Sequence, residues 1–234
     1  MKRFLSAEWR DLILANYEVP RELLLPRVPH GVELDDHDGR VFVSLVAFKF
    51  HRTKLRDIMI PGHVNFVEVN LRFYVKRQME GEVRRGTTFI KEFVPRQMIS
   101  QVARFAYGEP YETWSTGVSE PHNQLCYCWS KRQSRNSIEI EKPTKIQLPG
   151  LNSHGEFITE HYWGYTKRKE NHTSEYRVTH PQWEQSVIEN YQIKVDFERC
   201  YGKEFAFLND QIPYSVLFAL GSEIEIFPGI NLRE

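Results

Sequence analysis

Residues 65–77, NFVEVNLRFYVKR, constrain the fold more than any other stretch, because apolar and mixed positions alternate strictly along them. A period of two is the signature of a β-strand, whose successive side chains leave on opposite faces. One face is wholly apolar and must pack on a core; it comprises Val67, Val69, Leu71, Phe73 and Val75. The other face comprises Phe66, Glu68, Asn70, Arg72, Tyr74 and Lys76. This second face either meets water, as in an ordinary half-buried sheet, or lines a polar cavity.

The rest of the chain predicts many short strands and few helices. Strands are expected at 40–50, 86–94, 125–132, 136–142, 162–167, 174–179 and 215–227, with Gly221 as a bulge or kink in the last. Helices are expected at 95–107, 155–161 and 198–208, and within 8–19 after Ser6, unless the end of that stretch is already extended. This pattern predicts a mainly β (α+β) fold with a closed or nearly closed antiparallel sheet. With no composition shift and no internal repeat, residues 1–234 are expected to form a single domain.

Composition excludes several classes of partner. Lysine plus arginine equals aspartate plus glutamate at 31 each, so no net field attracts nucleic acid or an acidic membrane. No apolar run approaches the roughly 20 residues that span a bilayer, and the N-terminus makes a poor signal peptide. The cysteines, Cys126, Cys128 and Cys200, cannot all pair, and a CxC without a second pair is a poor zinc site. We therefore expect a reduced, cytoplasmic protein that needs no metal or cofactor and does not bind membranes.

Several segments together resemble the bacterial DUF2071 family, also called YqjF-like. They are VSLVAF (43–48), NFVEVNLRFYV (65–75), RRGTTFIKEFVP (84–95), YGEPY (107–111), FITEHYWGYT (157–166), EYRVTHPQW (175–183) and PYSVLFALGSEIEIF (213–227). The family is placed in the acetoacetate decarboxylase-like superfamily. The resemblance implies an antiparallel β barrel or cone around a central, partly polar cavity, with a few peripheral helices. It also implies that homo-oligomers are possible.

The resemblance assigns the mixed face of 65–77 to the cavity. Glu68 looks like the counterpart of a glutamate that the decarboxylases carry into their cavity, and Asn70 and Arg72 share its face. Backbone rise separates Glu68 from Arg72 by about 13 Å, so the two are expected to bracket a small ligand rather than pair directly. The catalytic lysine of the superfamily is not conserved. Its glycine-x-proline-lysine-lysine motif matches 108–112, where Tyr111 and Glu112 replace the lysines. Neither a phenol nor a carboxylate forms an imine with a ketone.

Lys91 is the remaining candidate for imine chemistry, because it lies in mid-strand between apolar neighbours. If its face lines the cavity, burial would make its amine reactive. Strict alternation places Phe89 and Phe93 on the same face, which equally fits a core with a lysine at its rim. Glu92 is expected on the opposite face.

Other polar candidates are Tyr165, Arg177 and His180, with His161 nearby in the same motifs. The histidines lack HxH or HxxxH spacing, so hydrogen-bonded structural roles are expected rather than metal ligation. The sequence supports a small-molecule-binding protein for an organic acid, ketone or aromatic metabolite, with Glu68, Asn70, Arg72, Tyr165, Arg177 and His180 as the binding residues. The alternative is a lyase or hydrolase-type enzyme, with Glu68, Tyr111 or Lys91 as catalytic residues. A third possibility is an interaction protein without a ligand.

Overall fold

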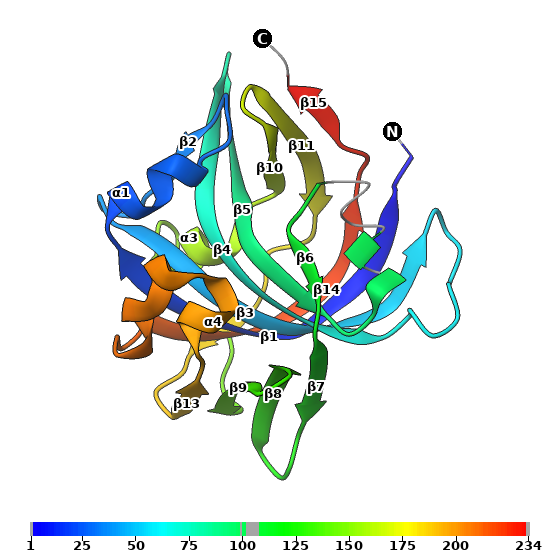
Figure 1. Cartoon of the computed structure of the whole chain (residues 1–234), viewed down its shortest axis with the longest axis vertical. Coiled ribbons are helices and arrows are strands. Elements are labelled where there is room, and N and C mark those ends of the chain that lie inside the picture. Colours follow the sequence, from blue (N-terminus) through cyan, green and yellow to red (C-terminus); the bar gives the residue numbers. More distant parts are fainter. Residues whose placement is uncertain (1, 99, 102–107, 233–234) are drawn as a thin grey trace.

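The computed structural model describes residues 2–98, 100–101 and 108–232 (Figure 1). Most of their strands lie in one large, mainly antiparallel sheet that closes on itself. Its ring runs through β14 (Ser215–Ile226), β1 (Leu5–Val19), β3 (Val41–Leu55), β4 (Phe66–Met79), β5 (Glu82–Val94), β10 (Trp163–Lys169) and β11 (His172–Thr179). Antiparallel pairing of Val178 with Ile226 joins β11 back to β14, and β5 and β10 pair in parallel. The expected barrel-like or cone-like antiparallel architecture is thus confirmed.

Short strands extend the ring at its margins, and a second sheet lies beside it (Figure 1). The marginal strands are β2 (Glu33–Leu34), β6 (Tyr111–Thr113), β12 (Gln185–Val187) and β15 (Ile230–Leu232). The second sheet has the order β13 (Tyr191–Lys194), β9 (Ser134–Glu141), β8 (Gln124–Lys131) and β7 (Ser115–Ser119). Its central hairpin, β8–β9, is the one that the sequence predicts at 125–142.

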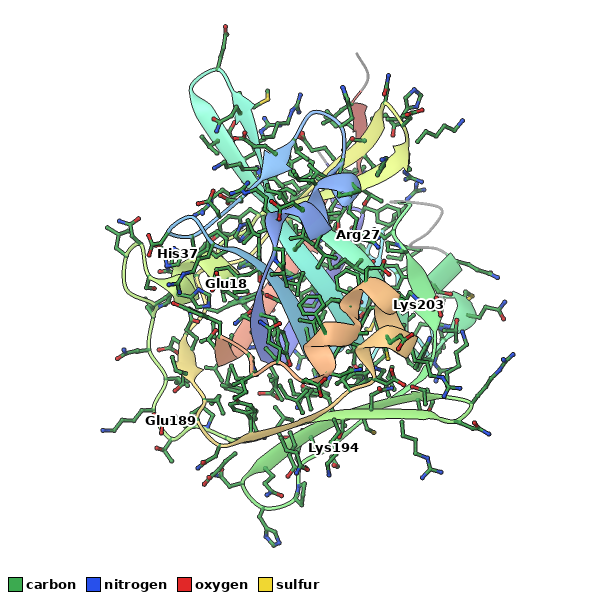
Figure 2. The ribbon with its side chains drawn as sticks, turned by 60° about the vertical axis from the view of Figure 1, so that its left-hand side comes forward. Glu18, Arg27, His37, Glu189, Lys194 and Lys203 are labelled. Carbon is green, nitrogen blue, oxygen red and sulfur yellow. The ribbon has the colours of Figure 1, made fainter. Side chains whose placement is uncertain are left out.

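The helices are short and peripheral. They are α1 (Arg21–Leu24), the 3-10 helix η1 (Leu25–Arg27), α3 (His154–Thr159), α4 (Phe197–Tyr201) and the 3-10 helix η2 (Lys203–Asn209). Figure 2 shows Arg27 and Lys203 on neighbouring helical segments outside the ring, where Arg27 forms an ion pair with Glu204. The helix predicted at 95–107 falls largely outside the described residues. No helix in the described ranges is long and apolar enough to cross a lipid bilayer.

The two faces of β4 have the different environments that its alternation predicts. Its apolar face, from Val67 to Val75, is at most 7% exposed and packs in the main core. That core is covered by α1, by α4 and η2, and by the second sheet, all on the outside of the ring. The mixed face of β4 points to the inside of the ring. The outer layer thus buries the apolar face, and the inner face is left to form a cavity.

The prediction of a helix near the N-terminus is wrong, because Leu5–Val19 form β1. A β-bulge at Asp11 explains the misleading pattern. Asp11 adopts a positive φ of 53°, and the register slips between Arg10 and Ile13. The extra residue brings Leu12 to the same side of the sheet as Trp9, which a regular strand would not do. Opposite the bulge, Gly221 has a φ of +74°, and a Cβ there would lie 2.0 Å from the Trp9 carbonyl oxygen.

Candidate active site

The inside of the ring encloses a cavity with a volume of about 180 Å³. Much of its wall is aromatic, formed by Trp9, Phe48, Phe50, Phe66, Phe89, Trp163 and Trp183. A polar wall adds Glu68, Asn70, Arg72, Glu92, Glu109, Tyr111, His161, Tyr176 and His180. A cavity of about 150 Å³ accommodates benzene, so this one suits a ligand of one small ring or a short branched chain. An apolar body with a few polar groups is the kind of molecule that such a lining binds.

Glu68 lies at the centre of the polar wall. Its side chain is buried, and its carboxyl accepts hydrogen bonds from Asn70 Nδ2 at 2.9 Å and from the Tyr111 hydroxyl at 3.0 Å. Burial raises the pKa of Glu68 to about 7, although the two hydrogen bonds and the Arg72 charge favour its ionised form. A carboxyl with a pKa near neutrality can both take up and release a proton at physiological pH.

Two further buried glutamates, Glu92 and Glu109, lie beside Glu68. Burial, together with the charges of Glu109 and Glu68, raises the pKa of Glu92 well above its usual value. Neither carboxyl oxygen of Glu92 has a well-formed hydrogen bond among the described residues, although the nearby Tyr111 hydroxyl lowers this pKa slightly. Burial raises the pKa of Glu109 to about 8, opposed by a hydrogen bond from the Tyr176 hydroxyl and by the Arg168 charge. We call Glu68, Glu92 and Glu109 the carboxyl cluster.

Local backbone features bring the carboxyl cluster together. The register between β4 and β5 slips at Ile90, so that Phe89 pairs with Arg72 but Lys91 pairs with Leu71. This bulge places Phe89 and Glu92 on the cavity side, and it turns Lys91 away. Glu92 in turn pairs in parallel with Tyr111 at the start of β6. Glu109 reaches the same point because only Pro110 separates it from that strand.

Arg72 provides the positive charge of the cavity wall. Its guanidinium donates to the Ile158 carbonyl at 3.4 Å and lies 5.7 Å from the Tyr74 ring. The Arg72 Nε is buried and has no hydrogen-bond partner among the described residues, and no described carboxylate forms a salt bridge with this side chain. An arginine in such surroundings has donor capacity left for an anionic ligand.

Two histidines complete the wall near Arg72. His161 is buried, and its Nε2 lies 3.4 Å from Asp35, which also accepts a 2.7 Å hydrogen bond from Arg85. Burial lowers the pKa of His161 to about 4 despite Asp35, so His161 is neutral at pH 7. The His180 ring stacks on Trp183 at 4.1 Å, and burial lowers its pKa to about 4 as well. These neutral rings present hydrogen-bonding groups to the cavity without adding charge.

The structure places three sequence candidates away from the cavity. Lys91 is half-buried and forms a 3.1 Å salt bridge with Glu112 outside the ring, because the Ile90 bulge separates its face from that of Phe89, which lines the cavity. Arg177 is exposed, since its neighbours on β11, Tyr176 and Val178, occupy the inward positions. Tyr165 is buried in the main core and does not line the cavity.

The structure also adds residues that the sequence did not suggest. Glu92 was expected only to point away from Lys91, and Glu109 served only as a spacer in the 108–112 motif. Glu68, Asn70, Arg72, Tyr111 and His180 do line the cavity, and their binding roles stay predictions. Within the described ranges, no group of three or more His, Cys, Asp or Glu side chains is arranged to hold a metal ion. The site offers proton donors, proton acceptors and one guanidinium.

Solved structures share this architecture over nearly the whole chain. Acetoacetate decarboxylase from Legionella pneumophila superposes with a TM-score of 0.71 over 97% of this chain and 86% of its own, at 12% identity. An acetoacetate decarboxylase-like enzyme from Sphingomonas wittichii gives 0.68 over 100% and 95%, at 12% identity. The enduracididine biosynthesis enzyme MppR, complexed with the condensation product of pyruvate and imidazole 4-carboxaldehyde, gives 0.67 over 100% and 91%, at 12% identity. At such low identity these similarities establish the fold alone.

Sequence comparison identifies the family. The protein YqjF of Bacillus subtilis, described as uncharacterized, is 35% identical over 68 residues, which are 29% of this chain and 28% of YqjF. The model of the DUF2071 family, described as an uncharacterized conserved protein, matches residues 6–223. That match includes every polar residue of the cavity wall named above. The chain therefore belongs to the DUF2071 family, as its motifs predicted.

Proposed function

We propose that this protein binds a small organic acid with an apolar body inside the ring. The observation that carries the proposal is the environment of Arg72, a cation in the wall of an aromatic cavity. Its buried Nε donates a hydrogen bond to no described residue. A ligand carboxylate would satisfy this guanidinium through charge-assisted hydrogen bonds. The aromatic side chains would bury the ligand's apolar body.

The size of the cavity and the structural neighbours support this class of ligand. A volume of about 180 Å³ suits a benzoate-sized acid. One neighbour is named for acetoacetate, and another is complexed with a condensation product of pyruvate. Acetoacetate and pyruvate are both small oxo acids. This chain replaces the superfamily's lysine motif with Tyr111 and Glu112, so binding here would not depend on an imine.

Benzoate titration tests the proposal. Arg72→Met should weaken benzoate binding about 10- to 100-fold, which is the value of one to two hydrogen bonds to a charged group. Isothermal titration calorimetry measures the affinity. Arg177→Met is the matched control, because Arg177 lies on β11 but faces solvent, and it should bind benzoate like the wild type. Equal benzoate affinity in Arg72→Met and the wild type would overturn the proposal.

A second candidate function is an enzyme that uses general acid–base catalysis. Glu68 favours it, because burial raises its pKa to about 7 and the Tyr111 hydroxyl hydrogen-bonds to it. Such a pair could remove a proton adjacent to a ligand carbonyl and return it elsewhere, as lyases and isomerases of oxo acids require. The alternative with Lys91 as an imine-forming residue is disfavoured by its salt bridge outside the ring.

Deuterium exchange tests the enzymatic candidate. In D₂O the wild-type protein should accelerate loss of the pyruvate methyl signal, followed by proton NMR. Glu68→Gln should reduce this acceleration by about 10²- to 10⁴-fold, the usual contribution of a general base. Lys91→Met should catalyse pyruvate methyl exchange at the wild-type rate, and borohydride should trap no covalent adduct between pyruvate and the protein. A wild-type protein without any acceleration would leave binding as the only function proposed here.

A further inference from the structure

The polar wall around the carboxyl cluster contains more hydrogen-bond acceptors than its described residues can satisfy. Both carboxyl oxygens of Glu92 and the amide oxygen of Asn70 are buried without a hydrogen-bond partner among these residues. The Nδ1 of His161 is in the same situation. When His161 donates its Nε2–H to Asp35, Nδ1 is an acceptor too. Unpaired buried acceptors are costly, so a wall that keeps several of them is suited to a donor-rich partner.

Three donors beside the carboxyl cluster already have acceptors. The Tyr111 hydroxyl and the Asn70 amide both donate to Glu68, and the Tyr176 hydroxyl donates to Glu109. Arg72 interacts with Glu68 electrostatically, whereas the charges that act on Glu92 are the negative ones of Glu109 and Glu68. Glu92 therefore lies among carboxyl groups, and it pairs with Asn70 on β4, two pairs away from Arg72.

We propose that Glu92 and its neighbours in the carboxyl cluster bind a cationic nitrogen group, such as an ammonium or amidinium, of the ligand. Such a group supplies several N–H donors and a positive charge to the carboxyl oxygens of Glu92, which have no well-formed hydrogen bond among the described residues. The inference deepens the proposed function, because it rests on this cavity being the ligand site. A ligand with a carboxylate at Arg72 and an ammonium at Glu92 would be a small amino acid or a similar zwitterion.

Binding of a cation should release protons from the carboxyl cluster. The titratable and charged groups around Glu92 are Glu68, Arg72, Glu109, Tyr111, Arg168 and Tyr176. Burial raises the pKa values of the three glutamates, so their carboxyl groups are mostly protonated at pH 6.5 before a ligand binds. A cation placed beside them stabilises their ionised forms and expels a proton to the buffer. An anion bound at the same wall would instead favour protonated carboxyls and take up protons, so the two ligand charges give opposite signs.

Benzylamine and benzyl alcohol test the proposal, because they have the same size and differ in charge. Calorimetry at pH 6.5, in buffers with different ionisation enthalpies, gives both the affinity and the number of protons exchanged. We expect benzylamine to bind at least about tenfold more tightly than benzyl alcohol and to release up to about one proton. Equal affinities, or proton uptake with benzylamine, would overturn the proposal on the wild-type protein alone.

Glu92→Gln locates the effect. It should weaken benzylamine about tenfold or more, reduce the proton release, and leave benzyl alcohol unaffected. Glu112→Gln is the matched control, since Glu112 lies outside the ring and pairs with Lys91 and Lys131. Benzylamine binding that survives Glu92→Gln unchanged would contradict the assignment. If benzylamine binds as expected and benzoate does not bind, only the organic-acid proposal is refuted. If benzoate binds as expected and benzylamine does not, only this inference is refuted.

Discussion

The free energy of unfolding should fall by roughly 1 to 3 kcal/mol per pH unit between pH 6.5 and pH 8, because of the carboxyl cluster. Burial raises the pKa of Glu68 to about 7, that of Glu109 to about 8 and that of Glu92 well above the usual value. In the unfolded chain these glutamates ionise near pH 4.3. The folded protein therefore binds more protons in this window. Its stability is full below the unfolded pKa and is lost as the pH rises through the folded values.

The decline should become visible only above pH 6.5, because three buried histidines act in the opposite direction below it. Burial lowers the pKa values of His154, His161 and His180 to about 4, whereas the unfolded chain protonates them near pH 6.5. Their contribution is therefore lost as the pH falls from 6.5 to 4. This loss of stability from the histidines opposes the stability that the glutamates contribute as the pH falls over the same range. Urea denaturation at several pH values measures the resulting profile.

Glu109→Gln should flatten this decline. The amide keeps the shape of the side chain but does not titrate, so the average slope between pH 6.5 and 8 should decrease by about 1 kcal/mol per pH unit. Glu112→Gln provides the control. Hydrogen bonds from Trp114 and Lys91 outweigh partial burial and hold the pKa of Glu112 at about 2, far below the window. An unchanged slope in Glu109→Gln would show that this carboxyl ionises normally in the folded protein.

Alternation along the chain predicted the part of the site that lies on β4. Its strict period of two separates the buried face from the face that carries Glu68, Asn70 and Arg72, because a regular strand leaves no other choice. The closed sheet followed from the number of short strands and from the family motifs. What alternation could not tell was whether the mixed face meets water or a cavity, since this depends on the β11–β14 pairing that closes the ring.

The errors occur where a single extra residue changes the face. The bulge at Asp11 gives β1 a spacing like that of a helix, and the bulge at Ile90 places Phe89 and Lys91 on opposite faces, although alternation predicted one shared face. A bulge has no strong sequence signature when the bulged strand has no glycine at that position. The Glu109 position was missed for another reason, because the loop before β6 has no periodicity from which to derive a direction.

The pairing partner of Lys91 shows the same limit. Its apolar neighbours suggested a desolvated amine, but Glu112, which directly follows Tyr111, forms the salt bridge that keeps Lys91 outside. Tyr111 and Glu112 leave β6 on opposite sides, one to the cavity and one to the outer surface. The two positions where the superfamily motif has lysines thus have unrelated environments in this protein. Only the three-dimensional pairing of β5 with β6 reveals this.

Native mass spectrometry of the protein purified from its own host tests the central claim most directly, namely that the cavity holds a small ligand through Arg72. The wild-type protein should carry an added mass that matches one small acid or amino acid, since the volume is about 180 Å³. Arg72→Met should retain much less of that mass, and Arg177→Met should keep it. The same added mass on Arg72→Met, or an empty wild-type protein that also fails to bind benzoate and benzylamine, would contradict the account.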